Sequence, residues 1–286
     1  MFVATLATKL ALNDLRIFLK TISLWSTDEF PTIYLFADSA VISAIPSFAY
    51  AGKIISKDVL NIYSQYNRAQ MERIPGKLYP SLWFEFQAEK LALLQWVFDS
   101  ESTATDAGVF YFDADICFLG PLPTIPIGSN VGLSPHNIRE TDEAKYGRYN
   151  AGYIWMKTSL AIEAWRQGCK TSRFFEQAAL EYFDTDSWTE GGVYKFPIQH
   201  NYGWWRLWQG RKPADEQKKE WSIFRNSAHS GILVNREPLC SVHTHWLDGG
   251  DHAVKEFNMF ILNFLNKLSG KTQTARLLIQ TLSHKI

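Results

Sequence analysis

The sequence has few cysteines, few charged residues and no long apolar run, and each shortage excludes a class of protein. Its three cysteines, Cys117, Cys169 and Cys240, form no CxxC pair. They therefore provide neither a disulfide framework nor a zinc site, and we interpret them as small buried residues of a protein from a reducing compartment. Lys and Arg number 29, as do Asp and Glu, and a surface of balanced charge does not capture nucleic acid or acidic membranes.

No run of about 18 uncharged apolar residues occurs, so we expect no transmembrane helix. The segment 1–14 (MFVATLATKLALND) carries no basic leader and no cleavage site, so we expect no signal peptide and a cytoplasmic protein. Aromatic residues are abundant, with 11 Trp, 12 Tyr and 19 Phe. Their rings fill protein cores, and they also stack on sugars and bases.

Strands and helices alternate over the first half of the sequence, which predicts an α/β fold with an open, largely parallel sheet. The second half is less regular and contains a loop-rich stretch at 185–222. The predicted strands are Phe2–Ala7, Thr32–Phe36, Lys53–Ile55, Val109–Phe112, Val131–Leu133, Tyr153–Met156 and Val242–His245. The predicted helices are Leu12–Trp25, Ser81–Ser100, Ala161–Phe183 and Ala253–Leu268, the last of which we expect to pack on the domain.

The clearest chemical signal follows the strand at Val109–Phe112. Asp113 and Asp115 project to the same side of an extended chain, and they repel each other unless a cation lies near them. Carboxylate oxygens favour Mg²⁺ or Mn²⁺, and ligands bind at the carboxyl ends of strands in open α/β sheets. We therefore predict a divalent metal site here. A second Asp-X-Asp at 184–186 lacks a preceding apolar strand, and we interpret it as a turn that ends a helix.

The segment 110–122 (FYFDADICFLGPL) resembles the metal-binding strand of the GT-A type nucleotide-diphospho-sugar transferases, the DxD glycosyltransferases. Three further segments occur in the order expected for that family: a helix that carries Lys90, then Asn150-Ala151-Gly152-Tyr153, and finally Val242–Trp246. The resemblance implies a GT-A (Rossmann-like) open mixed sheet flanked by helices, with a C-terminal acceptor-side region. It implies one glycosyltransferase domain over 1–286, in which 1–118 bind the nucleotide sugar, 119–252 face the acceptor and 253–286 form C-terminal helices.

The resemblance also implies a metal centre. Asp113 would contact the nucleotide ribose or reach the metal through water, and Asp115 would bind the metal directly. His243 is the first choice for a third ligand, with His245 as the alternate, because both have the same parity on a strand. A neutral imidazole is a good Mn²⁺ ligand, and this set leaves coordination positions for phosphate oxygens. The expected cofactor is Mn²⁺ or Mg²⁺.

Roles for the donor and the acceptor follow from the same resemblance. Lys90 would approach the diphosphate or the donor sugar, although it is equally consistent with an exposed charge on an amphipathic helix. Asn150 is a catalytic candidate that would meet the sugar or the acceptor, with a plain turn residue as the alternative. The remaining predicted donor-binding residues are Thr5, Leu6, Ala7, Thr8 and Ala114, and the predicted acceptor-binding residues are His200, Asn201, Trp204 and Trp246.

Glu190 is the second catalytic candidate, because the glycines that follow it let the backbone approach a ligand closely. The family often carries an Asp-Gln pair in this region, and the segment 188–205 has none. The predicted activity is metal-dependent transfer of a sugar from a UDP- or GDP-sugar to a hydroxyl of a glycan or another acceptor, with retention of configuration. The alternatives are an HAD-like phosphatase or hydrolase that uses the DxD, and a non-catalytic sugar-binding module.

Overall fold

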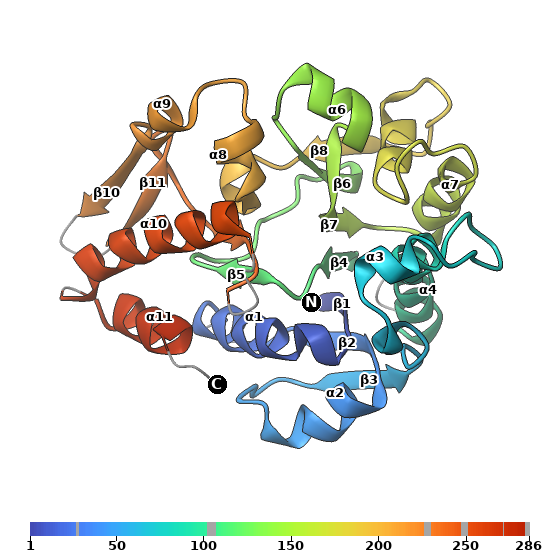
Figure 1. The fold of residues 1–286 in the computed structure, drawn as a ribbon, viewed down its shortest axis with the longest axis horizontal. Coiled ribbons are helices and arrows are strands. Elements are labelled where there is room, and N and C mark those ends of the chain that lie inside the picture. Colours follow the sequence, from blue (N-terminus) through green and yellow to red (C-terminus); the bar gives the residue numbers. More distant parts are fainter. Residues whose placement is uncertain (27–28, 102–106, 226–229, 247–250, 271, 284–286) are drawn as a thin grey trace.

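A mixed seven-stranded sheet forms the centre of the molecule, in the order β3-β2-β1-β4-β7-β6-β8 (Figure 1). The computed structural model describes residues 1–286 apart from 27–28, 102–106, 226–229, 247–250, 271 and 284–286. The strands of the sheet are β1 (Phe2–Ala7), β2 (Thr32–Ala37), β3 (Ile54–Asp58), β4 (Val109–Phe112), β6 (Ser129–Pro135), β7 (Tyr149–Met156) and β8 (Gly192–Lys195).

One strand of this sheet, β7, runs opposite to the other six. Strands β1 to β4 are parallel to one another, whereas β7 runs antiparallel to both β4 and β6, and β8 is parallel to β6. The sheet is therefore mixed, and its first four strands in this order are parallel. The expectation of an open mixed α/β sheet is confirmed.

Helices cover both faces of the sheet. Helix α1 packs on one face with Val3 of β1, and α4 packs on the other face with Ala4, as expected from the alternation of side chains along a strand. The α-helices are α1 (Leu12–Leu24), α2 (Ser39–Ala44), α3 (Arg68–Met71), α4 (Leu82–Ser100), α6 (Glu140–Tyr146), α7 (Ser159–Cys169), α8 (Trp205–Gln209), α9 (Ala214–Lys218), α10 (His252–Ser269) and α11 (Gln273–Ser283). The 3₁₀ turns are η1 (Lys9–Ala11), η2 (Ile45–Ser47), η3 (Tyr63–Gln65), η4 (Ala178–Asp184) and η5 (Ile198–His200). Within the described ranges, no helix has the length and apolarity needed to span a membrane.

A small sheet beside the main one places a histidine against the acidic pair. It has the order β5-β13-β9, formed by β5 (Ile116–Phe118), β13 (Ser241–His243) and β9 (Tyr202–Gly203). Strand β13 runs antiparallel to β5, so His243 lies opposite Ile116, the residue that follows Asp115. A third sheet, β10 (Trp221–Arg225), β11 (Ser230–Val234) and β12 (Glu237–Pro238), supports the C-terminal region.

The C-terminal helices α10 and α11 lie against each other and against the domain (Figure 1). Phe257, Ile261 and Leu265 of α10 are buried in a cluster that also contains Leu278 of α11 and Val242 of β13. The helix predicted at 253–268 therefore packs on the domain, as expected from its apolar face.

The long helix predicted at Ala161–Phe183 is wrong. Helix α7 ends at Cys169, and a separate turn, η4, begins only at Ala178. Thr171 and Ser172 favour turns over helices, and Phe175 has a positive φ of 43°, which no α-helix accommodates. The indole of Trp165 donates a hydrogen bond to the Glu176 carbonyl, so the chain turns back toward α7. This turn places Glu176 and Gln177 beside the sheet.

Candidate active site

Two carboxylates and one imidazole meet where β4 ends. The His243 Nε2 atom lies 3.1 Å from Oδ1 of Asp115 and 3.8 Å from Oδ2 of Asp113. One ligand atom from each of these three side chains lies within 4.8 Å of the others. Oxygen and imidazole donors at this spacing suit a divalent cation such as Mn²⁺ or Mg²⁺. The carboxylates lie on the turn between β4 and β5, and the imidazole comes from β13 of the small sheet, so the fold itself brings them together.

A chain of amides fixes the orientation of His243. Its Nδ1 atom lies 3.2 Å from Oδ1 of Asn201, and Asn201 donates from Nδ2 to Oδ1 of Asn150 and to Oγ of Ser134, both at 3.0 Å. Because Asn201 presents its oxygen, Nδ1 of His243 must carry the proton. The Nε2 atom therefore faces the two carboxylates and is the ring nitrogen that could bind a metal.

Gly152 provides the space that this group occupies. A Cβ atom at this position would lie 2.2 Å from Oδ2 of Asp113 and 2.6 Å from Cε1 of His243. Both distances are far below van der Waals contact. Its carbonyl also accepts a hydrogen bond of 2.9 Å from the Asp113 amide. Glycine is therefore required at this position for the carboxylate and the imidazole to lie close together. Their proximity supports a binding site for a small ion.

His245 is a second histidine that lies close to the acidic pair. Its Nδ1 atom lies 3.1 Å from Oδ2 of Asp14 and 3.5 Å from Oδ2 of Asp115. The charge of Asp115 and the hydrogen bond to Asp14 raise the pKa of His245 to about 9. Burial raises the pKa of Asp14, although the hydrogen bond from His245 opposes the shift. Burial also opposes ionisation of Asp115, but the charges of His243 and His245 outweigh it and lower its pKa.

Lys90 lies between two carboxylates on the other side of the site. Its Nζ atom is 2.9 Å from Oε1 of Glu176 and 3.3 Å from Oδ1 of Asp113. Burial disfavours the charged amine, but Asp113 and Glu176 more than compensate and raise the pKa of Lys90 to about 12. The Tyr111 hydroxyl donates a hydrogen bond of 2.8 Å to the same oxygen of Asp113. Asp113 is thus held through Oδ1, and its other oxygen faces His243.

The site opens into a cavity of about 340 Å³ with aromatic and polar walls. Such a mixture of stacking surfaces and a few polar groups is typical of sugar-binding clefts. The lining residues are Arg68, Trp83, Gln87, Lys90, Asp113, His136, Ile138, Tyr146, Asn150, Phe174, Phe175, Glu176, Gln177, Trp204, Trp205 and Gln209.

The structure brings several of the predicted residues to this site. Lys90, Asn150 and Trp204 line the cavity together with Asp113, and Asn201 is fully buried beneath it. The predicted base-binding residues Thr5, Leu6, Ala7 and Thr8 form the carboxyl end of β1 and the residue that follows it. That strand runs beside β4, and Ala114 lies between the two carboxylates.

Three predicted residues lie elsewhere. Glu190 is exposed next to β8 and does not line the cavity. His200 packs against Phe196 behind the small sheet, and its lowered pKa reflects burial. Trp246 donates its backbone amide to Asp14. Their predicted roles in catalysis and acceptor binding receive no support from these positions.

Sequence reasoning missed Glu176, Gln177, His136 and Asp14. An adjacent acid and amide occur earlier in the chain, as Glu176-Gln177, in a segment for which a helix was predicted. Nε2 of Gln177 donates to the Tyr146 carbonyl at 2.9 Å, so its oxygen faces Asn150. An adjacent acid and amide within a Phe-rich segment (FFEQ) was the available signal. Asp14 gave no signal, because its partner His245 is 231 residues away.

Comparison with known proteins supports the fold. No family model and no curated protein matches this sequence. The solved galactosyltransferase LgtC, in complex with donor and acceptor sugar analogues, matches with 14% identity and a TM-score of 0.57 over 96% of each chain. An active-site variant of LgtC, with glutamate in place of a glutamine, matches at 14% and 0.54 over 91% of this chain and 95% of that one. The glycosyltransferase GlyE of Streptococcus pneumoniae TIGR4 matches at 12% and 0.51, over 98% of this chain and 62% of GlyE.

At this identity the likeness shows the fold, and that fold is the one shared by GT-A glycosyltransferases. The resemblance first noted on the segment 110–122 is thus confirmed over nearly the whole chain. In the observed strand order, β4 is the last strand of the parallel half of the sheet, and β7 runs antiparallel beside it. Asp113 and Asp115 follow β4, so they lie at this boundary.

Proposed function

We propose that this protein is a glycosyltransferase that moves a sugar from a UDP- or GDP-sugar to a hydroxyl of a glycan or another acceptor, with a divalent cation and with retention of configuration. The single observation that carries the proposal is the convergence of Asp113, Asp115 and His243 on a GT-A sheet, next to a cavity that Asp113 lines. Asp113, Asp115 and His243 would hold Mn²⁺ or Mg²⁺, and the glycine cradle at Gly152 fits a small ion.

A bound divalent cation neutralises negative charge on the departing nucleoside diphosphate. The chain contributes a second fixed charge. Lys90 stays protonated because Asp113 and Glu176 flank it, and it lines the cavity next to Asp113. A buried ammonium of fixed position stabilises a developing anion without reorganising, which lowers the barrier to departure.

The residues next to Lys90 are suited to hold the donor sugar. Glu176 and Asn150 present hydrogen-bonding groups to the cavity beside Lys90. The amide of Gln177 is locked, because Nε2 donates to the Tyr146 carbonyl and Oε1 lies 3.4 Å from both Nδ2 of Asn150 and the Ala151 amide. A fixed amide oxygen can support positive charge that develops at the anomeric carbon. The glutamine in the active site of LgtC makes Gln177 the first residue to test for a role in retention.

The two alternative functions have less support. A phosphatase of the HAD type needs its first aspartate free as a nucleophile. One oxygen of Asp113 is engaged by both Tyr111 and Lys90, and the sheet is that of the GT-A fold. A non-catalytic sugar-binding module would not need the buried Lys90–Glu176 pair or the space reserved by Gly152.

Calorimetric titration of UDP and GDP, each with and without Mn²⁺, tests this function. We expect tight binding of one nucleotide only with the metal, and its loss in Asp115→Ala, which removes a ligand from a surface cleft. Asp186→Ala is the matched control, because that residue belongs to the second Asp-X-Asp and is exposed. Equal nucleotide binding by Asp115→Ala and the wild type would refute the metal site. The anomeric configuration of the product, followed by NMR, then tests retention.

A further inference from the structure

His136 lies directly after β6 and lines the cavity, and it is not among the residues proposed to hold the metal or the donor sugar. Its Nδ1 atom lies 2.7 Å from the Gly147 carbonyl oxygen. A carbonyl oxygen only accepts hydrogen bonds, so Nδ1 must carry a proton. Burial lowers the pKa of His136 to about 4, although the hydrogen bond to Gly147 opposes the shift. The ring is therefore neutral near pH 7, and its Nε2 atom has a free lone pair.

This Nε2 atom has no hydrogen-bond partner among the described residues, and it is not one of the polar atoms that are sealed from solvent without a partner. Since only 4% of the residue is exposed and its ring lines the cavity, the cavity is the route by which Nε2 is reached. A buried hydrogen-bond acceptor that faces an open cavity is available to a ligand group that donates a hydrogen bond.

The ring cannot easily turn away. The buried Arg206 donates from Nη1 to the His136 carbonyl and from Nη2 to the Pro135 carbonyl, both at 2.6 Å. The indole of Trp205 packs at right angles against the ring, with centroids 5.8 Å apart. The same indole contacts His243 at 4.9 Å. The Trp205 indole therefore contacts both His136 and the proposed metal ligand His243.

The wall that contains His136 is distinct from the wall that contains Lys90. Ile138 pairs with Gly210 next to α8, and the Arg139 amide donates to the Gln209 carbonyl. His136 and α8 thus form one wall. Lys90, on α4, is joined to Glu176 in another part of the lining. A donor sugar on the Lys90 side leaves the His136 side for the second substrate.

The geometry points to Nε2 of His136 as the atom that accepts a hydrogen bond from a hydroxyl of the acceptor sugar. This inference rests on the proposed function and names a specificity-determining residue for it. A neutral imidazole with Nδ1 already engaged offers only a lone pair, so its partner must donate a hydrogen. A hydroxyl satisfies this condition, whereas a carboxylate or phosphate at the same position is rejected, because two acceptors would face each other.

The test uses the intact protein with UDP-glucose, UDP-galactose or GDP-mannose, whichever is hydrolysed in the presence of Mn²⁺. Methyl glucosides, methyl galactosides, lactose and maltose serve as acceptor probes. His136→Phe keeps a ring of similar size and removes both nitrogens. We expect it to raise the KM of the best probe about tenfold. His136→Gln, which restores an oxygen acceptor, should recover part of the loss, and His252→Phe on the exposed start of α10 serves as the control.

Monodeoxy versions of the best probe add a measurement that a structural defect would not move. In the wild type one deoxy position should weaken the probe, and in His136→Phe that same position should cost nothing further. Histidine ¹⁵N NMR gives an independent signature, because Nε2 of His136 should be unprotonated and should shift when the probe is added.

The two proposals fail separately. Absence of Mn²⁺-dependent nucleotide binding and donor hydrolysis in the wild type would refute the proposed function. A protonated Nε2 in the NMR spectrum, or an unchanged KM in His136→Phe beside an active wild type, would overturn the role of His136 alone.

Discussion

The substitution Gly152→Ala should abolish metal-dependent nucleotide binding while the fold survives. The new methyl group would lie 2.2 Å from Oδ2 of Asp113 and 2.6 Å from Cε1 of His243. Asp113 cannot simply swing aside, because its other oxygen is held by the Tyr111 hydroxyl and by Lys90. The clash is therefore relieved by moving the carboxylate oxygen that faces the proposed metal.

The size of the effect follows from these distances. Restoring van der Waals contact requires a displacement of about 1 Å, whereas metal–ligand bonds tolerate only about 0.2 Å. Misplacement on this scale costs about 100-fold, or about 2.7 kcal/mol of binding free energy. The cost in folding free energy is smaller, about 1–3 kcal/mol for an overpacked methyl.

Calorimetric titration of UDP or GDP with Mn²⁺ gives the binding, and urea unfolding gives the stability. Gly270→Ala at the end of α10 is the matched control, because nothing lies within 4 Å of its new methyl group. In the double variant Asp113→Ala/Gly152→Ala the main clash partner is gone, so part of the stability should return while binding stays lost. A Gly152→Ala protein that binds nucleotide and Mn²⁺ as the wild type does would refute the claim that this glycine makes room for the ion.

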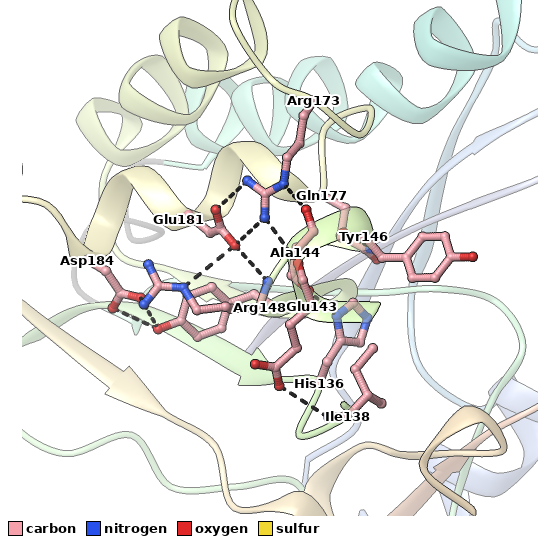
Figure 2. Close-up of polar contacts among 12 residues, drawn as sticks. His136, Ile138, Glu143, Ala144, Tyr146, Arg148, Arg173, Gln177, Glu181 and Asp184 are labelled. Carbon is pink, nitrogen blue, oxygen red and sulfur yellow. Dashed lines mark hydrogen bonds and ion pairs between the residues drawn. The ribbon is translucent and has the colours of Figure 1, made fainter. Parts of the chain in front are cut away.

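Two further predictions concern the charged groups around the site. Lys90→Met leaves Glu176 buried without a cation. The free energy of unfolding of this variant, measured in urea, should therefore fall by about 3–5 kcal/mol. Adding Glu176→Gln should recover most of this stability without restoring turnover, and a double variant as unstable as Lys90→Met would contradict the pairing. Arg173 donates to the Ala144 carbonyl, to the Glu143 carbonyl and to both oxygens of Glu181 (Figure 2), which ties α6 to the segment that carries Gln177. Arg173→Ala should therefore lower stability by about 1–2 kcal/mol and raise the KM of the acceptor. Arg166→Ala, which breaks a similarly exposed pair with Glu163, should cost under about 0.5 kcal/mol; equal effects of the two arginine variants would argue against the tie.

Elements built from local patterns could be predicted closely from the sequence. The strand Phe2–Ala7 and the strand Val109–Phe112 have the predicted bounds, and α1 differs by one residue at its end. Apolar periodicity carries this information within a single segment. The acidic pair was predictable for the same reason, because the strand and the two carboxylates are contiguous.

Features that depend on contacts between distant segments could not be predicted in the same way. Apolar periodicity predicts a helix that continues through Thr171 and Ser172. In the structure, the hydrogen bond from Trp165 to the Glu176 backbone accompanies the earlier end of the helix. That error hid Glu176 and Gln177 from the candidate site. Burial and the nearby charge of Arg206 lower the pKa of His136, and a carbonyl eleven residues later fixes which ring nitrogen is protonated. Neither fact is visible in a window of sequence.

The neighbours of the acidic pair explain how the site can exist before any ion binds. Two carboxylates so close together repel each other in a low-dielectric environment. Here Lys90 and the Tyr111 hydroxyl stabilise Asp113, while His243 and His245 stabilise Asp115.

The backbone also holds both residues, because the Asp113 amide donates to the Gly152 carbonyl and the Thr244 amide donates to the Asp115 carbonyl. The ligands are thus positioned by hydrogen bonds and by charges that the chain supplies itself. Ion binding at the proposed site would cost little reorganisation, and its free energy would then be available for holding the pyrophosphate of the proposed donor rather than for folding the protein.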